Sequence, residues 1–212
     1  MEEIKFNKSK EVSPLGGLKG GVVIINYGAG NIQSIKFAIQ RLGFEAVLSH
    51  DEEEIRNADK VIFPGVGEAS SAMEMLKSTG LDKVIPTLKQ PVLGICLGMQ
   101  LMCKYCEEGD TKGLNIFDVD VVKFDDREKV PQIGWNQIEN LKSDLFKGIN
   151  EKEYMYLVHS FYVPINEEAI ATTTYGIKYA SALQEKNFYG VQFHPEKSSK
   201  AGAQILKNFL EL

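Results

Sequence analysis

A short apolar run that ends in a cysteine between two glycines constrains this chain more than any other feature. Val92 to Ile95 is typical of a buried strand, Cys96 follows at once, and the residues from about Leu97 to Cys106 predict a helix. Gly94 and Gly98 stand two positions before and after the cysteine, so the stretch is the thiol counterpart of the G-x-S-x-G nucleophile elbow. Such a turn would hold the sulfur at a helix N-terminus, where the helix dipole favours a thiolate. The alternative is a buried cysteine in a glycine-bounded core strand.

The segments around this turn predict an α/β fold. Val22 to Ile25 is apolar at every position, as expected for a strand of a parallel sheet that is buried on both faces. Further strands are expected at 44–48, 61–63 and 188–193, and helices at 32–42, 51–57, 70–78, 81–89 and 198–212. From about Leu114 the chain becomes rich in β-type segments with short turns. We predict a flavodoxin-like, open, mostly parallel central sheet flanked by helices, with an added antiparallel or mixed β portion in the C-terminal half.

Composition bounds the domain organisation and the classes of partner. Residues 1–20 are polar and show no period, so we expect an N-terminal extension, followed by one domain over residues 21–212. The net charge of −5 argues against a nucleic-acid partner. No apolar run reaches the roughly 18 residues that span a bilayer, and no signal peptide is evident, so we expect no membrane contact. Three cysteines clustered in one segment indicate a reducing, cytoplasmic location rather than a secreted disulfide framework.

A thiolate nucleophile needs a base, and the base needs a group that orients it. His194 follows the last predicted strand, at the edge of the sheet where α/β sites form, and Glu196 stands two residues further on. Cys96, His194 and Glu196 therefore predict a catalytic triad. His50 is expected at the surface. His159 lies in a strongly β-type stretch, where it either is satisfied in the core or lines the pocket, and base rates slightly favour the core.

The functional interpretation of three other motifs is weaker. Pro64 to Gly67 ends a predicted strand beside the elbow, where its backbone N–H groups could complete an oxyanion hole; an ordinary strand exit is equally compatible. Gly28-x-Gly30 lacks the rest of a dinucleotide-binding fingerprint. Cys103 and Cys106 fit C-x-x-C without further ligands, so we expect packing residues and neither a metal nor a cofactor.

With these residues assembled, the chain resembles the class I glutamine amidotransferases, and among them the family of glutaminase subunits of imidazole glycerol phosphate synthase. The resemblance runs from about Val22 to the C-terminus. Its carriers are Asn26-Tyr27-Gly28-Ala29-Gly30-Asn31, Pro64-Gly65-Val66-Gly67, Gly94-Ile95-Cys96-Leu97-Gly98-Met99-Gln100, Val130-Pro131-Gln132-Ile133-Gly134-Trp135-Asn136, His159-Ser160 and Gly190-Val191-Gln192-Phe193-His194-Pro195-Glu196-Lys197-Ser198. The extension before Gly21 departs from this family.

The resemblance implies roles for particular residues. Cys96 would attack the side-chain amide of glutamine, with His194 as base and Glu196 as its orienter. The oxyanion hole would be formed by Gly65, Val66, Gly67 and Leu97. Glutamine would be held by Gln100, Glu108, His159 and Ser160. Trp135, Asn136, Tyr156 and Lys197 would dock on a cyclase subunit with a (β/α)₈-barrel fold, which would receive the ammonia.

Two rival hypotheses remain at this point. The same fold could belong to a self-standing cysteine peptidase or γ-glutamyl hydrolase, which would turn over its substrate without a partner. It could also belong to a non-catalytic docking subunit, which would have an unreactive Cys96.

Overall fold

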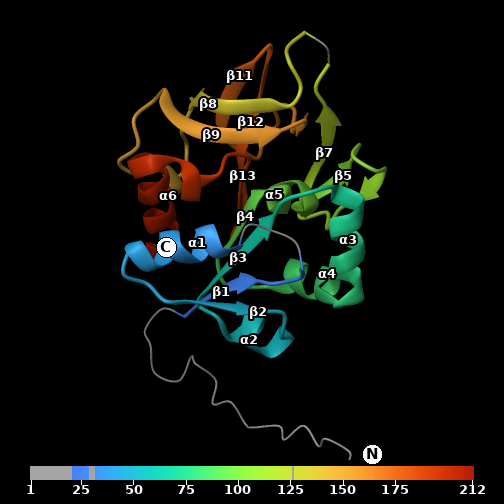
Figure 1. Ribbon diagram of the computed structural model, residues 1–212, viewed down its shortest axis with the longest axis vertical. Coiled ribbons are helices and arrows are strands. Elements are labelled where there is room, and N and C mark those ends of the chain that lie inside the picture. The colour runs from blue at the N-terminus through green and yellow to red at the C-terminus, as the bar shows by residue number, and fades with distance from the viewer. Residues whose placement is uncertain (1–20, 29–31, 126) are drawn as a thin grey trace, which may run out of the picture.

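The computed structural model describes residues 21–28, 32–125 and 127–212 (Figure 1). The predicted extension over residues 1–20 lies outside the described residues. A seven-stranded sheet forms the centre, in the order β11-β12-β13-β4-β3-β1-β2. Its strands are β1 (Val22–Ile25), β2 (Ala46–Ser49), β3 (Lys60–Gly65), β4 (Val92–Cys96), β11 (Ala169–Tyr175), β12 (Ile177–Glu185) and β13 (Phe188–Val191). The five strands from β13 to β2 are parallel, and β11 and β12 are added antiparallel at one edge, which confirms the predicted fold class.

Helices cover both faces of this sheet. They are α1 (Ile32–Arg41), α2 (Glu52–Asn57), α3 (Ala69–Ser78), α4 (Leu81–Val84), α5 (Leu97–Met102) and α6 (Ser199–Glu211), with 3₁₀ turns η1 (Ile85–Thr87), η2 (Asp144–Phe146) and η3 (Pro195–Lys197). Side chains of β1 alternate between two cores. Val23 and Ile25 pack with α3 and α4, whereas Val22 and Ile24 pack with α1 and α6. This two-sided burial explains why the strand is apolar at every position.

The added β portion contains two further sheets besides the antiparallel edge of the central sheet. A four-stranded sheet has the order β10-β7-β5-β6, and β8 pairs with β9 in a separate antiparallel ribbon. These strands are β5 (Cys103–Cys106), β6 (Thr111–Lys112), β7 (Phe117–Lys123), β8 (Gln132–Ile138), β9 (Glu153–His159) and β10 (Phe161–Tyr162). Single bridges, Glu139 to Thr172 and Val163 to Ala180, tie these pieces to the central sheet. Figure 1 shows the β8–β9 ribbon lying above α6 and beside β12.

The helix after the cysteine is shorter than the sequence indicated. It ends at Met102, so the expected helix to Cys106 is wrong, and the last four of those residues form β5. The carbonyls of Leu101 and Met102 accept hydrogen bonds from the backbone of Leu114 and Ile116. Because that returning segment satisfies the C-terminal carbonyls, the chain leaves the helix and pairs as a strand. The expected helix at 81–89 is likewise split into α4 and η1, with Pro86 in the first turn of η1.

The lengths and compositions of the helices bear on whether the chain could cross a membrane. Within the described residues, none combines the length and the apolar character that a span requires.

Candidate active site

The nucleophile elbow has the geometry that its glycines suggested. Cys96 ends β4 and directly precedes α5, with φ 54° and ψ −113°, a conformation that few side-chain-bearing residues adopt. A Cβ on Gly94 would lie 2.9 Å from the backbone nitrogen of Met99, and one on Gly98 would collide with the carbonyl of Phe63. Both glycines are therefore required for the tight packing of the elbow against β3 and α5.

The predicted base and its orienter lie on the neighbouring strand exit. Because β13 pairs in parallel with β4, the residues that follow the two strands meet at the same edge of the sheet. His194 Nδ1 lies 3.0 Å from Glu196 Oε1, and the Glu196 side chain is only 1% exposed. Its other oxygen, Oε2, has no hydrogen-bond partner among the described residues. The Glu196 carboxylate is thus directed at a single partner, the His194 ring.

The electrostatics of His194 connect it to the cysteine. Burial of the ring would lower its pKa, but hydrogen bonds with Cys96 and Glu196 and the negative charges of both groups raise the pKa of His194 to about 10. The protonated imidazole is thus held between the Cys96 sulfur and the Glu196 carboxylate. The sulfur from the middle of the chain and the imidazole from near its end are neighbours, as the predicted triad requires.

The main chain of His194 is held in place by β9. Its N–H donates to the carbonyl of Tyr156 at 2.9 Å, and its carbonyl accepts from the Ser198 hydroxyl at 2.6 Å. The same hydroxyl oxygen accepts from the Tyr156 N–H at 3.0 Å. The β8–β9 ribbon is therefore bonded directly to the segment that carries the imidazole.

The end of β3 lies against the elbow, where an oxyanion hole was predicted. Gly65 pairs with Cys96 in the sheet register, and a Cβ on Gly65 would lie 2.9 Å from the Leu97 backbone. The hydroxyl of buried Tyr27 donates to the carbonyl of Pro64 at 3.0 Å and fixes this segment. Burial, and then the nearby Cys96, raise the pKa of Tyr27, which keeps the hydroxyl a neutral donor.

A pocket of about 330 Å³ opens above the sulfur. Most of the predicted site residues line it, including two of the triad, three of the four predicted oxyanion-hole residues and all four of the predicted glutamine-binding residues. The lining residues are Val66, Gly67, Cys96, Leu97, Gln100, Glu108, Pro131, Val158, His159, Ser160, Phe161, His194 and Lys197. Gly65 and Glu196 lie behind this lining. Trp135, Asn136 and Tyr156 do not line it.

Two of the predicted glutamine-binding residues also serve the scaffold. The Gln100 amide nitrogen donates to the carbonyl of Phe161 at 3.1 Å and to Gln192 Oε1 at 2.8 Å. Glu108 Oε2 accepts from the Ala69 N–H at 2.8 Å, and burial raises the pKa of this carboxyl. Each side chain is thereby fixed where it lines the pocket.

Both interpretations of His159 fit the structure. The ring is buried, with Nδ1 2.7 Å from the Phe161 carbonyl and Nε2 3.1 Å from the Tyr179 hydroxyl, yet it also lines the pocket. Burial lowers the pKa of His159 to about 4. The ring is therefore a neutral part of the pocket wall near pH 7.

Sequence reasoning missed several residues around the sulfur. Pro131, Val158 and Phe161 complete the pocket wall, and Gln192 is fully buried with its amide nitrogen 3.7 Å from Cys96 Sγ. The position of Gln192, two residues before His194 and directly after β13, the strand that pairs with β4, was the available signal.

The two remaining cysteines behave as packing residues. Cys103 and Cys106 are buried, and burial raises the pKa of Cys106 to about 12 and that of Cys103 well above its usual value. Neither forms a disulfide. Within the described ranges, no group of three His, Cys, Asp or Glu side chains is placed to hold a metal ion. The Gly28-x-Gly30 turn lies partly outside the described residues.

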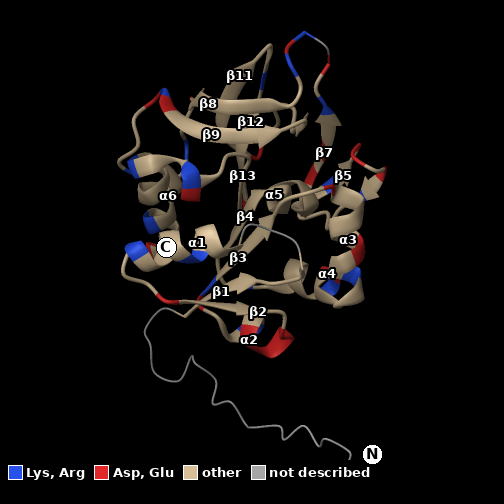
Figure 2. Ribbon diagram, in the orientation of Figure 1, with Lys and Arg blue, Asp and Glu red and all other residues tan. Residues whose placement is uncertain are grey.

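The outer face of the β8–β9 ribbon is aromatic and exposed. Trp135 is 50% exposed and stacks edge-on against Tyr156, with ring centroids 6.0 Å apart. Lys197 Nζ lies 5.9 Å from the centre of the Tyr156 ring. Ile133 and Tyr154 extend the apolar face, and Figure 2 shows the strands β8 and β9 almost free of charged residues. The Asn136 side-chain amide instead donates to the carbonyl of Thr174 in β11 at 2.9 Å.

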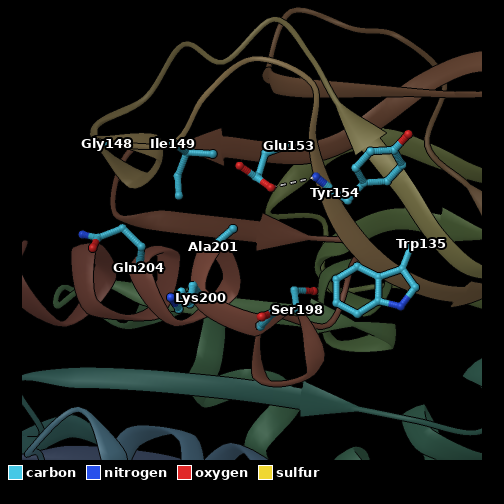
Figure 3. A pocket seen from close by; sticks show the side chains of 10 residues that line it. Trp135, Gly148, Ile149, Glu153, Tyr154, Ser198, Lys200, Ala201 and Gln204 are labelled. Carbon is cyan, nitrogen blue, oxygen red and sulfur yellow. Dashed lines mark hydrogen bonds between the residues drawn. The ribbon is translucent and has the colours of Figure 1, made fainter.

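A groove of about 480 Å³ runs beside this face, between β9 and the first turns of α6 (Figure 3). Trp135 and Tyr154 form its aromatic wall, and Ser198, Lys200 and Gln204 come from the helix side. Because Trp135 belongs to both features, the groove and the aromatic face form one continuous surface.

The chain is similar to known proteins over most of its length. The family described as Glutamine amidotransferase class-I matches residues 23–212. The chain is 57% identical over 194 residues to the imidazole glycerol phosphate synthase subunit HisH of Bacteroides fragilis (strain YCH46), which covers 90% of this chain and 99% of that relative. It is 45% identical over 192 residues to the subunit HisH of Haemophilus influenzae (strain ATCC 51907 / DSM 11121 / KW20 / Rd), with coverage of 90% and 96%. A solved structure of a glutamine amidotransferase shares the fold, with a TM-score of 0.71 at 18% identity over 90% of this chain and 98% of that chain.

Proposed function

The chain belongs to the class I glutamine amidotransferases and, within them, to the HisH subunits of imidazole glycerol phosphate synthase, and from that premise we propose that Cys96, His194 and Glu196 are its catalytic triad. It is a glutaminase whose ammonia feeds the synthesis of imidazole glycerol phosphate in histidine biosynthesis. The observation that carries the triad is the contact of His194 with both Cys96 and Glu196 at the floor of one pocket.

The proposed reaction is nucleophilic acyl transfer. Cys96 Sγ attacks the side-chain carbonyl carbon of glutamine. The imidazolium of His194 then gives its proton to the amide nitrogen, the carbon–nitrogen bond breaks, and ammonia leaves a glutamyl thioester on Cys96. Water, deprotonated by His194, attacks the thioester carbon and releases glutamate and the free thiolate. Glu196 orients the ring and stabilises its charge, since its carboxylate has no other hydrogen-bond partner among the described residues.

The carbonyl oxygen that becomes negative during attack needs donors. We assign this role to the backbone N–H groups of the Gly65–Val66–Gly67 segment and of Leu97. The close approach of Gly65 to the start of α5 supports the assignment. Gln100, Glu108, His159 and Ser160 would hold the rest of the glutamine molecule, and their shared place in the pocket wall supports this.

The partner is the cyclase subunit of imidazole glycerol phosphate synthase, for which we propose a (β/α)₈-barrel fold. The docking face would be built from Trp135, Tyr156 and Lys197, whose exposed aromatic cluster lies next to the pocket. Asn136 would contribute by holding the ribbon in place rather than by contacting the cyclase, because its side-chain amide donates to the carbonyl of Thr174. We place the reaction in the cytoplasm, which the three disulfide-free cysteines support.

The decisive experiment measures ammonia release from glutamine by the protein reconstituted with the cyclase and its ligand. A Cys96→Ala protein is expected to lose activity by about 10⁴-fold or more. Cys106→Ala is the matched control, because it removes a buried thiol that does not line the pocket. Ammonia release by Cys96→Ala at the wild-type rate would refute the proposal. Full turnover without the cyclase would instead favour a self-standing hydrolase.

A further inference from the structure

We propose that Gln192 is a positioning residue for the nucleophile, whose side-chain amide donates a hydrogen bond to Cys96 Sγ and favours the thiolate. This rests on the proposed function of Cys96 and adds a second group that acts on its sulfur. Gln192 Nε2 lies 3.7 Å from Cys96 Sγ, within range of an N–H···S contact, and the Gln192 side chain is fully buried. A buried amide keeps its place only if its polar atoms are satisfied.

A chain of contacts fixes which end of the Gln192 amide faces the sulfur. The Phe161 carbonyl can only accept, so the Gln100 amide nitrogen must be the atom that faces it, at 3.1 Å. The second hydrogen of that nitrogen points to Gln192 at 2.8 Å, which requires an oxygen there. With Oε1 turned to Gln100, Gln192 presents its nitrogen to Cys96. The donor orientation thus follows from a main-chain carbonyl two contacts away.

The other neighbour of the sulfur has the opposite preference. The carbonyl of Val158 lies 3.8 Å from Cys96 Sγ, where it accepts the proton of a neutral thiol and repels a thiolate. The N–H of Gln192 does the reverse, because hydrogen bonds to a charged acceptor are stronger than those to a neutral one. Gln192 therefore offsets Val158 and holds the sulfur in its reactive form on the side away from the solvent.

Gln192 cannot reach glutamine, because it is fully buried and absent from the pocket lining. Gln192 can therefore act on the reaction only through the groups that it contacts, the Cys96 sulfur and Gln100, and a test without glutamine isolates the contact with the sulfur. That separates it from Gln100, which lines the pocket and also orients Gln192.

The test is the pH profile of Cys96 alkylation by iodoacetamide, measured on the full chain without glutamine and assigned to Cys96 by peptide mass spectrometry. Gln192→Met keeps the length of the side chain but removes the donor. We expect alkylation about tenfold slower at pH 7 and a profile displaced to higher pH, with the same rate at the high-pH plateau. Gln192→Glu, which replaces the donor with an acceptor, should displace the profile further.

Asn208→Leu is the matched control. It removes another buried amide, one that donates to the carbonyls of Leu145 and Lys147 and does not line the pocket, and should leave the profile in place. If Gln192→Met does not fold, Gln100→Met tests the same point, because it leaves Gln192 without the partner that orients it; a displacement in the same direction is expected.

An alkylation profile of folded Gln192→Met, or of Gln100→Met in its place, that coincides with the wild type would overturn the proposal. That outcome is distinct from failure of the proposed function. In the first case Cys96→Ala is still inactive as a glutaminase, whereas in the second it remains active whatever the Gln192 variants show.

Discussion

The two buried histidines show how differently the same side chain is used at two places around one pocket. His159 and His194 are almost equally buried, at 6% and 5% exposed. Yet the pKa of His159 is lowered to about 4, whereas that of His194 is raised to about 10. Burial alone pushes both values down, so the difference must come from the groups that face each ring.

The partners of the two rings differ in charge. His159 is bonded to the carbonyl of Phe161 and the hydroxyl of Tyr179, both of which are neutral. His194 lies between a thiol group that can ionise and the Glu196 carboxylate. Negatively charged partners, rather than exposure, therefore distinguish a histidine that can transfer protons from one that is a neutral part of the pocket lining.

The largest effect on activity is expected when the charged histidine itself is replaced. A His194→Gln protein is expected to lose glutaminase activity by about 10⁴-fold or more, since both the base and the proton donor disappear. The measurement is ammonia release in complex with the cyclase and its ligand. His50→Gln, which alters an exposed histidine outside the pocket, is the control and should retain wild-type activity. Ammonia release by His194→Gln within tenfold of the wild-type rate would show that His194 is not the catalytic base.

A smaller effect should follow when His194 keeps its ring but loses the carboxylate. Glu196→Gln is expected to reduce activity by about 10³-fold, because the ring is less well oriented and its cation less stabilised. The raised pKa of His194 makes its ionic contacts stabilise the fold fully below its ordinary pKa of about 6.5, and this stabilisation is lost as the pH rises through about 10.

Thermal unfolding at a series of pH values tests that sign. Glu196→Gln should be less stable than the wild type near pH 6.5, and the gap should close as the pH approaches 10. A gap that stays constant over this range would mean that the carboxylate does not hold the charge on His194.

The smallest expected effect concerns the neutral histidine. The folded protein resists protonation of His159 down to about pH 4, whereas the unfolded chain accepts the proton near pH 6.5. The free energy of unfolding of the wild-type protein should therefore fall below pH 6.5, by about 1.4 kcal/mol per pH unit from this residue alone. His159→Gln should lack this dependence, although it loses about 1–2 kcal/mol at pH 7.5 through altered hydrogen bonds.

Denaturant unfolding between pH 7.5 and 5 checks this prediction, because the carboxyl groups of both proteins titrate in common and cancel in the difference. The two stabilities should converge as the pH falls. Parallel curves would show that folding leaves the pKa of His159 unchanged, so that burial does not keep its ring neutral.

Local patterns were sufficient to predict much of the site. The glycines around Cys96 indicated the elbow because only a residue without a side chain fits against the neighbouring backbone there. The strand ending before His194 indicated the edge of the sheet, and Glu196 stood within reach in the sequence. The alternation of buried side chains in β1 likewise follows from its unbroken apolar run.

Other features had no local signal. Nothing in Cys103 to Cys106 revealed that the segment would leave the helix, because the cause is hydrogen bonding to residues 114–116. No local pattern singled out Gln192 among the polar residues of its motif. The orientation of its amide depends on Gln100 and on the carbonyl of Phe161 in β10, which come from distant segments.

The sequence by itself determined the fold class, the family and the candidates for the reacting residues, because these depend on apolar period, glycine spacing and side-chain chemistry within short segments. Only the tertiary structure decided which histidine carries a charge and which side of the sulfur meets a donor. Those properties are set by groups brought together from distant segments, and electrostatic and hydrogen-bond energies depend on that spacing rather than on order along the chain.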